Sequence, residues 1–451
     1  LMSWPVLLIM HKGNFTIFRI IGLAFVLAMF LLIYSRGGLI VFCGQLVLLG
    51  IYYFKRIKLK TILMFLAVVL FAIGIFTLAN NVRELQHQTI EIEEKVTFGG
   101  GESISSMQER KDFWAGSLEL IEEKPLFGWG PFSFRYAYNP IQKTLLGNSD
   151  HPHNVFLKIG AENGLIAMGT FIAFLFVVFF TVIKRFPKLS KIRKDFVYLI
   201  SVAIAGGFAH SLIDYNFNFI ANLLLLFVLL IMLRSAVVVK DNQERKGFAS
   251  VAISLLIVVF AIYELIVLAL SQTINYNFLS FSFYPRDYYV SVAEKAVEQN
   301  DFGRALTALE EAEKLNSLDS RTNYLEGEIY CDEDFQSNNP LVCKSNFAQA
   351  LAQNPMNNFT YYFDYVKLLS PNAVSENDLK IIQRATELLE IYFDYVELNL
   401  HFTAYTENVE SAYELAQILG SYLSPEKADE LKIKSEKMLS IARKLRTNKT
   451  F

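Results

Sequence analysis

The stretch Gly164–Ile183, written GLIAMGTFIAFLFVVFFTVI, decides the fold class. It carries no charged residue and matches the roughly 20 residues that a helix needs to cross the hydrocarbon core of a bilayer. Working outward from it, comparable apolar runs lie at 16–34, 38–54, 61–79, 196–213, 217–239 and 248–270, and a partial run lies at 1–10. Lipid cannot satisfy free backbone groups, so each run is expected to be a helix. The sequence predicts an all-α, polytopic transmembrane helical bundle.

Composition agrees with this class. Of 451 residues, 53% are hydrophobic and 19% charged, which indicates a membrane protein with a water-facing part rather than one soluble globule. The net charge of -2 gives no bulk attraction to nucleic acid, and none is expected as a partner. Three cysteines exclude a disulfide framework and a four-thiolate zinc site. The first residue is Leu rather than Met, and the opening run is typical of the tail of a hydrophobic span, without the basic region of a signal peptide. We therefore expect the numbered chain to begin inside a longer protein.

Basic residues near the ends of the spans predict the orientation. They cluster at 55–60, at 184–194 and at Arg245–Lys246, and such clusters stay in the cytoplasm. The connections at 35–37, 80–163 and 214–216, and everything after 270, are then expected outside the cytoplasm. The sequence therefore predicts a multi-pass protein of the cytoplasmic (inner) membrane. Its expected domains are a transmembrane domain at 1–270, including the large loop 80–163, and an extracytoplasmic helical domain at 271–451.

The loop 80–163 is expected to contain an amphipathic helix on the membrane surface. Ser106–Glu109 resembles a capping box, which would start this helix. Met107, Trp114, Leu118 and Ile121 follow at helical spacing and would share its apolar face. Pro125 would end it, and the glycines and proline of 128–131 predict an ordered turn.

The polar sequence after residue 270 resembles tetratricopeptide repeats. Small and apolar residues recur at helical spacing at Ala305, Leu309, Ala312 and Leu315, and then at Gly327, Tyr330, Ala350 and Pro355. The likeness is loose, because Ser317 stands where the motif has proline, and residues 380–445 give no clean third copy. Cys331 and Cys343 lie in this domain, where a disulfide and two free thiols are equally open.

Three arginines lie at the predicted outer face. Arg36 sits in a short hairpin beside Gly37 and Gly38, where it suits either a snorkelling contact with lipid headgroups or bidentate binding of phosphate. Arg110 and Arg135 lie among aromatic residues, including Trp114, and each alone reads as a surface charge. Together the three suit an anionic ligand at the membrane surface, with sugar rings stacking on the aromatic side chains.

The segment SDHPHN at 149–154 offers two histidines, for which three interpretations stand. A metal site is disfavoured, because no second cluster of ligands is obvious. Helix capping by Asp150 or Asn154 needs no imidazole. A neutral imidazole can also serve as a base near neutral pH.

Two further ionisable groups lie near the same predicted face. Glu162 lies nine residues after His153, where a carboxylate near lipid is expected to pair with an arginine or hold an amide. His210 ends a span on the same predicted face, where it joins the site or is a polar residue at the interface.

These motifs, in order, resemble the superfamily of O-antigen ligases and O-antigen polymerases, which includes bacterial O-oligosaccharyltransferases. The resemblance rests on Ser35–Gly37, Arg110 with Trp114, Pro125–Gly130, His153–Asn154 and Glu162–Gly164, and it covers about residues 16–235. It implies a GT-C-like, metal-independent, inverting glycosyltransferase without a cofactor, acting in polysaccharide and cell-envelope synthesis. Members of this family usually have more spans than the seven and a partial one predicted here, so the resemblance implies that N-terminal spans are missing from the numbered chain.

The resemblance also implies roles for single residues. Arg36 and Arg110 match positions that hold the donor diphosphate, and Arg135 is a further candidate. His153 matches the catalytic histidine of the outer loop better than His151 does, because it directly precedes Asn154. His151, Asn154, Glu162, Trp114 and His210 are expected to support the site.

The sequence therefore predicts transfer of a glycan from a polyprenyl-diphosphate donor to a hydroxyl acceptor, which is a glycan, a lipid or a protein. Membrane lipid and a protein bound by the repeat domain are the other expected partners. Two alternatives belong to other classes: an exporter of lipid-linked oligosaccharides, and a membrane-anchored assembly protein.

Overall fold

The computed structural model describes Met2, Trp4, Pro5, Leu8 and residues 16–32, 35–56, 59–85, 101–145, 147–238, 285–398 and 408–447. Within these residues all regular structure is helical, which confirms the all-α prediction. The chain divides into two compact units, one of residues 1–134 and 149–243 and the other of residues 135–148 and 244–451. The two are described separately.

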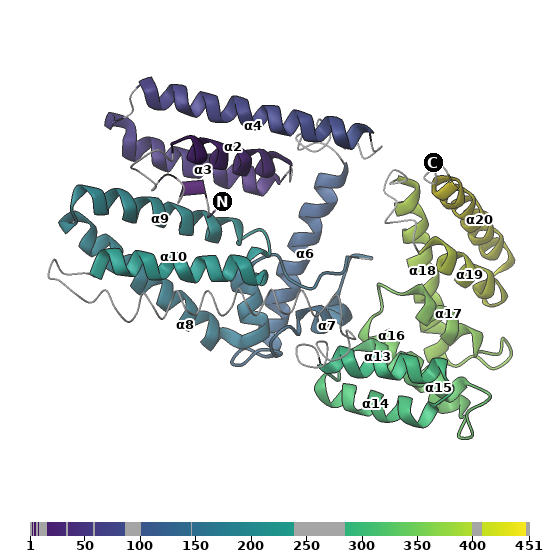
Figure 1. Cartoon of the computed structure of the whole chain (residues 1–451). Helices are drawn as coiled ribbons and strands as arrows, with labels where there is room; N and C mark the ends of the chain where they lie inside the picture. Colours follow the sequence, from purple (N-terminus) through teal and green to yellow (C-terminus); the bar gives the residue numbers. More distant parts are fainter. Residues whose placement is uncertain are drawn as a thin grey trace. The chain divides into compact units, whose positions relative to one another are not determined.

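The first unit is built from long helices that pack side by side (Figure 1). They are α2 (Thr16–Leu32), α3 (Arg36–Tyr53), α4 (Leu59–Leu85), α6 (Gly101–Glu123), α8 (Val155–Arg185), α9 (Lys191–His210) and α10 (Ile220–Val238). Short 3₁₀ turns follow α3, α8 and α9 at η1 (Phe54–Arg56), η3 (Phe186–Lys188) and η4 (Asn216–Asn218). Helix α2 packs on α4, α3 on α9, α9 on α10, and α6 on α8.

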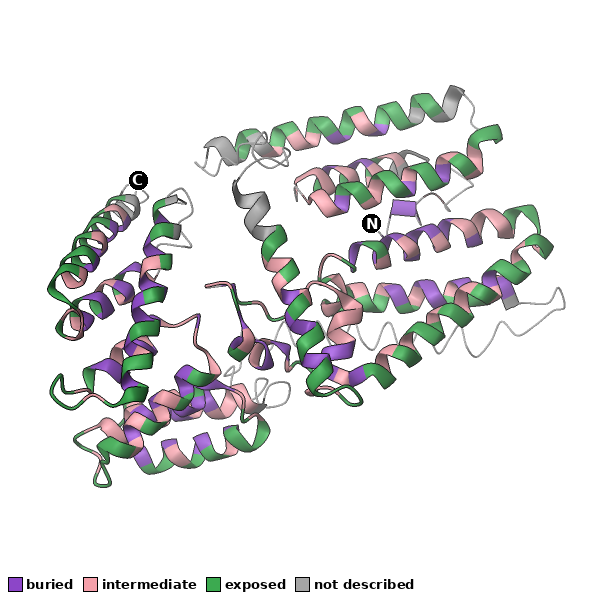
Figure 2. Cartoon of the chain, turned by 180° about the vertical axis from the view of Figure 1, so that it is seen from behind, coloured by how far each residue is buried: buried purple, intermediate pink, exposed green. Residues whose placement is uncertain are grey.

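Within the described residues, three helical stretches are long and apolar enough to cross a membrane: Arg36–Arg56, Val155–Lys188 and Ile220–Val237. Ile20–Leu32 and Phe65–Ala79 are shorter apolar helices. Helix α9, at the predicted span 196–213, is not among the three, because four charged residues lie near its start and it ends at His210. These residues are Lys191, Arg193, Lys194 and Asp195. The predicted span 248–270 lies outside the described residues. Helices α4 and α8 are exposed along much of their length (Figure 2), and many of their exposed residues are large and apolar. This exposure suits contact with lipid and indicates an integral membrane protein.

A buried amide joins α3 to α9. Gln45 is only 2% exposed, accepts a hydrogen bond from Trp4 Nε1 at 2.8 Å and donates one to the carbonyl of Val202 at 3.0 Å. A Cβ atom at Gly206 would lie 2.0 Å from Gln45 Nε2, so a larger residue there would displace this amide. Small residues and interhelical hydrogen bonds are the usual means of joining helices in lipid.

Helix α6 begins earlier than expected. It starts at Gly101, so Ser106–Glu109 lies inside the helix and the predicted capping box is wrong. Its buried side chains are Phe113, Ser117, Leu120 and Ile121, whereas Met107 and Leu118 are about half exposed. The sequence offered apolar residues on two faces of this helix, and packing against α8 selected the face that begins at Phe113.

The turn after α6 forms hydrogen bonds with α8 at a break in that helix. Gly164 has φ 81° and ψ 172°, which interrupts α8, and Leu165 N–H donates to the carbonyl of Pro125 at 2.7 Å. Trp129 and Gly130 N–H donate to the carbonyls of Ala161 and Glu162 at 3.0 and 2.8 Å. The motifs Pro125–Gly130 and Glu162–Gly164 therefore form one joint at the start of the span.

The glycines of this joint are required by space as well as by conformation. A Cβ atom at Gly164 would lie 2.1 Å from the carbonyl oxygen of Leu126, and one at Gly128 would lie 2.5 Å from the carbonyl carbon of Glu162. Both glycines also have positive φ, which other residues rarely adopt.

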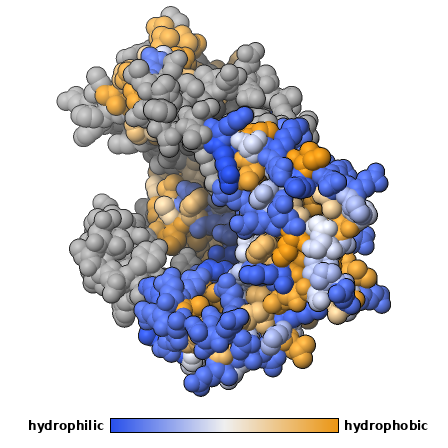
Figure 3. Space-filling model, turned by 90° about the vertical axis from the view of Figure 1, so that its right-hand side faces the viewer, coloured by the Kyte–Doolittle hydropathy of each residue, from blue (hydrophilic) through white to orange (hydrophobic). Residues whose placement is uncertain are grey.

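The second unit is a stack of shorter helices with a surface that is mostly hydrophilic on the face shown in Figure 3. They are α13 (Pro285–Glu298), α14 (Phe302–Leu315), α15 (Ser320–Cys331), α16 (Pro340–Gln353), α17 (Phe359–Lys367), α18 (Glu376–Leu398), α19 (Val409–Leu419) and α20 (Pro425–Thr447). Helices α13 and α14 pack as a pair, as do α15 and α16. Of the predicted repeat residues, Ala305, Leu309 and Ala312 are buried but Leu315 is half exposed, because it ends its helix.

Two further features hold the second unit together. Cys331 and Cys343 form a disulfide between α15 and α16, which settles the pairing that the sequence left open. Residues 135–148, with the end of α7 (Phe134–Ala137) and the turn η2 (Asn139–Ile141), join this unit through Gln142. Its amide exchanges two hydrogen bonds with that of Asn357, at 2.7 and 2.8 Å. The tetratricopeptide likeness stays a prediction.

Candidate functional site

His153 lies in the loop that leads into α8. Its backbone has φ 52°, an unusual value for a residue with a side chain, and such conformations are found preferentially at functional sites. Its ring stacks on Phe113 of α6 with centroids 5.7 Å apart and meets the ring of Tyr215 edge-on at 4.8 Å. These contacts fix the plane of the imidazole and leave its two nitrogens facing different polar groups.

The two nitrogens of His153 have distinct partners. Nε2 lies 3.3 Å from the hydroxyl of Ser149, and Nδ1 lies 3.6 Å from the carboxylate of Asp214. That second distance is too long for a hydrogen bond, and Nδ1 is buried without a hydrogen-bond partner among the described residues. A carboxylate beside one nitrogen of a histidine orients the ring and stabilises its protonated form.

Asp214 is the central acidic group of the site. Its carboxylate also lies 3.8 Å from Nε2 of His210, and it accepts a hydrogen bond from the N–H of Tyr215 at 2.8 Å. Burial raises the pKa of Asp214, but the two histidines and this N–H outweigh burial, so the pKa lies below its usual value. Asp214 is therefore ionised at neutral pH. Nothing in the sequence singled out Asp214, apart from its being a charge at the end of a predicted span.

The turn at 210–214 gathers segments that are far apart in the chain. Arg110 Nε donates to the carbonyl of Ile213 at 3.1 Å, and Asn154 Nδ2 donates to that of Leu212 at 3.1 Å. Ser35 Oγ lies 3.3 Å from Nε2 of His210. A Cβ atom at Gly37 would lie 2.4 Å from Ile213 Cδ1, so the start of α3 also packs closely against this turn.

A cavity of about 260 Å³ opens beside this turn. Its polar wall includes Ser35, His210, Asp214 and Asn216, and its apolar wall includes Phe30. His210 is buried, and its Nδ1 contacts the amide of Asn216. His210 thus lies beside Asp214 at the wall of this cavity, and its part in a reaction stays a prediction.

The arginines have different positions. Arg36 is the first residue of α3, half-buried, next to Ser35, which caps the helix by accepting from Gly38 N–H at 3.0 Å. Arg36 and Arg110 thus come from two segments that both contact the turn at 210–214. Arg135 belongs to the second unit, where its guanidinium lies 5.0 Å from the ring centroid of Tyr136. Its role stays a prediction.

Asn154 caps α8, as expected. Its side-chain oxygen accepts from the N–H groups of Phe156 and Leu157 at 2.9 and 3.1 Å. Glu162 is buried two turns further on, and its side chain accepts from the N–H of Phe134 at 3.4 Å and lies 3.7 Å from the ammonium of Lys158. The partner of this carboxylate is thus a lysine together with backbone amides, rather than an arginine.

Helix α6 contributes two further groups. Trp114 is half-buried, and its Nε1 has no hydrogen-bond partner among the described residues. Glu109 lies one turn before Phe113, the residue that stacks on His153. Burial raises the pKa of Glu109, while the charges of Arg110 and His153 partly oppose the shift. The sequence did not single out Glu109.

Among the described residues, no group of three or more His, Cys, Asp and Glu side chains is arranged to hold a metal ion.

Residues 21–172 match the O-antigen ligase family. This stretch runs from α2 into α8 and contains Arg36, Arg110, His153 and Glu162, whereas His210 and Asp214 lie beyond it. The similarity points to glycosyltransferase-type activity in the synthesis of the cell envelope, with a lipid-linked glycan and an acceptor as substrates. No curated protein and no solved structure matches the chain.

Proposed function

We propose that the protein transfers a glycan from a polyprenyl-diphosphate donor to the hydroxyl group of an acceptor at the outer face of the cytoplasmic membrane. The contact between His153 and Asp214 carries this proposal, because Asp214 orients His153 as a base. Asp214 also lies on the turn to which Arg110 donates a hydrogen bond. Ligase and polymerase are both versions of this reaction, since they differ only in the acceptor.

In the proposed reaction, Nε2 of His153 takes the proton of the acceptor hydroxyl, whose oxygen attacks the anomeric carbon. The bond from that carbon to the diphosphate breaks, and polyprenyl diphosphate leaves. Ser149 Oγ, 3.3 Å from Nε2, occupies a position in which an acceptor hydroxyl would replace it. Asp214 stabilises the imidazolium that forms, and attack from the face opposite the leaving group inverts the anomeric carbon.

The leaving diphosphate needs positive charge where its negative charge develops. Arg36 and Arg110 are the proposed sources, because guanidinium groups bind phosphate oxygens in pairs. The contacts of Gly37 and Arg110 with Ile213 support a position for both arginines near the site. Arg135 is retained as a further candidate for the same role.

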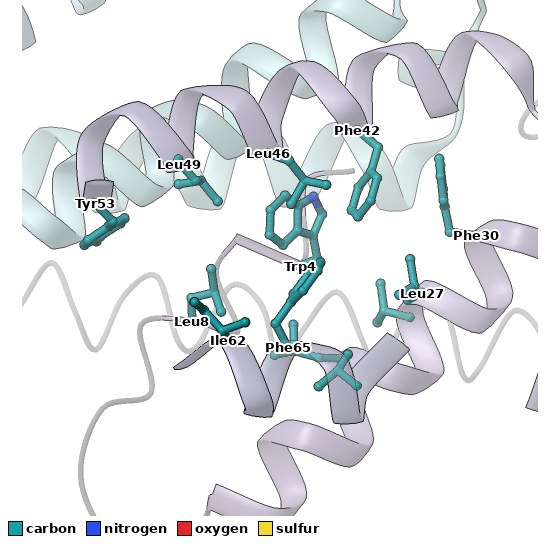
Figure 4. A pocket seen from close by; sticks show the side chains of 14 residues that line it. Trp4, Leu8, Leu27, Phe30, Phe42, Leu46, Leu49, Tyr53, Ile62 and Phe65 are labelled. Carbon is teal, nitrogen blue, oxygen red and sulfur yellow. The ribbon is translucent and has the colours of Figure 1, made fainter. Parts of the chain in front are cut away.

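An apolar cavity supports the lipid half of the proposal. It has a volume of about 360 Å³ and lies between α2, α3 and α4, with Trp4 and Phe65 among its walls (Figure 4). Phe30 lines both this cavity and the polar one beside Asp214. A donor whose apolar part entered here would have its diphosphate directed toward the polar residues.

The test is transfer of a labelled glycan from a polyprenyl-diphosphate donor to a hydroxyl acceptor by the purified protein in lipid. We expect His153→Ala to lower the rate by about 100-fold or more, as loss of a general base does. Arg36→Ala is expected to weaken transfer strongly, and Arg304→Ala, at an exposed position of α14, serves as its control. Full activity of a correctly inserted His153→Ala protein would refute the mechanism, and movement of donor across the bilayer without a new glycosidic bond would indicate an exporter.

A further inference from the structure

Lys158 occupies an electrostatically poor position. It lies in the first turn of α8, where the helix dipole disfavours a cation, and its side chain is only 14% exposed. Glu162 follows it at i+4, which is the less favourable order for a lysine–glutamate pair on a helix. A buried charge in such a place lowers stability unless strong local contacts offset it.

Those contacts come from segments on both sides of the candidate site. Lys158 Nζ lies 3.0 Å from Nδ1 of His151 and donates to Asn218 Oδ1 at 2.8 Å. It also lies 5.2 Å from the ring centroid of Phe132. Since an ammonium can only donate, His151 accepts at Nδ1 and carries its proton on Nε2.

The two hydrogen-bonded partners flank the reacting pair in the sequence. His151 precedes His153 by two residues, and Asn218 follows Asp214 by four. The ring of Tyr215 lies between these groups, 5.7 Å from His151 and 4.8 Å from His153. Lys158 thus ties the loop that carries His153 to the segment that carries Asp214.

We infer that Lys158 is a positioning residue, which holds His153 against Asp214 by bridging His151 and Asn218. This inference rests on the proposed function for its effect on rate, but the bridge itself can be tested without activity. A misplacement of about 1 Å in a catalytic group can lower a rate on the order of 100-fold. Because Lys158 does not contact the reacting atoms, its loss lowers kcat and leaves the KM for the donor nearly unchanged.

The test compares Lys158→Met with Lys158→Met/Glu162→Gln, which removes both buried charges and so avoids leaving a carboxylate unpaired. Both are expected to lower kcat at least about tenfold, with less than about a threefold change in donor KM. Adding His151→Phe to Lys158→Met is expected to cause little further loss, because both changes break the same bridge. Lys184→Met, at an exposed position of the same helix, is the control.

Hydrogen exchange separates this inference from the proposed function. In the Lys158→Met/Glu162→Gln protein, amides of 149–154 and 211–218 are expected to exchange faster, with α10 unchanged. Unchanged exchange in both segments would overturn the bridge, whether or not the wild type transfers glycan. The positioning role would be overturned by a wild-type kcat in the variant, by a rise in donor KM alone, or by additive losses with His151→Phe. An inactive wild type would instead overturn the proposed function.

Discussion

At the scale of single residues, the site depends on contacts that reach across the first unit. The sequence indicates His153 by its place before Asn154, but Asp214, which faces its Nδ1, lies 61 positions further along the chain by their residue numbers. Sequence spacing carries no information on such a pair. A carboxylate near the end of a predicted span was the only available signal, and the same signal fits an ordinary interfacial charge.

Asp214→Asn tests the orienting role. The amide keeps the shape of the side chain but loses its charge, so it no longer stabilises the imidazolium. We expect glycan transfer to fall by about tenfold or more, with unchanged insertion in the membrane, because Asp214 acts through His153. The rate is measured with the labelled donor. Transfer at the wild-type rate would show that the contact between His153 and Asp214 has no part in the reaction.

Glu109→Gln tests the cost of a half-buried carboxylate beside His153. Burial raises the pKa of Glu109 above its ordinary value of 4.5. Between pH 4.5 and the raised pKa, the folded protein therefore holds a proton that the unfolded chain has lost. The stability of the folded protein therefore falls as pH rises through this window, and the loss of stability remains at neutral pH, where the carboxylate is ionised. We expect the variant to have a higher apparent Tm than the wild type at pH 7, with a smaller difference at pH 4. An equal difference at both values would contradict this assignment.

At the scale of elements, the joint between Pro125–Gly130 and Glu162–Gly164 sets the course of the chain into the membrane. Both motifs were recognised from the sequence, but their pairing was not. Glycine patterns show where a backbone can take positive φ, and they do not show which other backbone comes close. Here the backbone that comes close to the break at Gly164 is that of the glycine-containing turn after α6, since Trp129 and Gly130 donate to carbonyls of α8.

Gly164→Ala tests this joint, and Gly169→Ala is its matched control on the same helix. A Cβ atom at Gly164 would lie 2.1 Å from the carbonyl oxygen of Leu126, whereas one at Gly169 would have no neighbour within 4 Å. We expect Gly164→Ala to lower the yield of folded protein and its apparent Tm. Gly169→Ala is expected to be neutral or slightly stabilising, because alanine favours a helix. Equal behaviour of the two proteins in a thermal melt would exclude the steric argument.

At the scale of the whole molecule, the chain combines an apolar helical unit with a second helical unit that has a hydrophilic surface on the face shown in Figure 3. The change in composition near residue 270 predicted two domains. It did not predict that residues 135–148, from the middle of the large loop, join the second unit through Gln142 and Asn357. That segment is short and mixes polar with apolar residues, so its own sequence does not indicate which unit it joins.

The disulfide of the second unit offers a test at this scale. Cys331 and Cys343 are 12 positions apart, and a short closed loop of this kind stabilises a fold by roughly 2–3 kcal/mol. We expect Cys331→Ser/Cys343→Ser to accelerate hydrogen exchange in α15 and α16 and leave α8 and α10 unchanged. Unaltered exchange in α15 and α16 would show that packing alone, including that of Gly327 on Phe347, is sufficient there.

The sequence by itself determined the helical class, the positions of the apolar helices that the structure describes, and the motifs that resemble the ligase family. These follow from local composition, because lipid accepts only apolar, internally hydrogen-bonded segments. Only the tertiary structure decided which face of α6 is buried, that Asp214 and His210 join His153, and that Lys158 bridges His151 to Asn218. Those outcomes depend on packing between distant segments. The apolar periodicity of a sequence does not distinguish two helix faces that differ by one residue, and it does not show which turn brings a carboxylate next to a histidine.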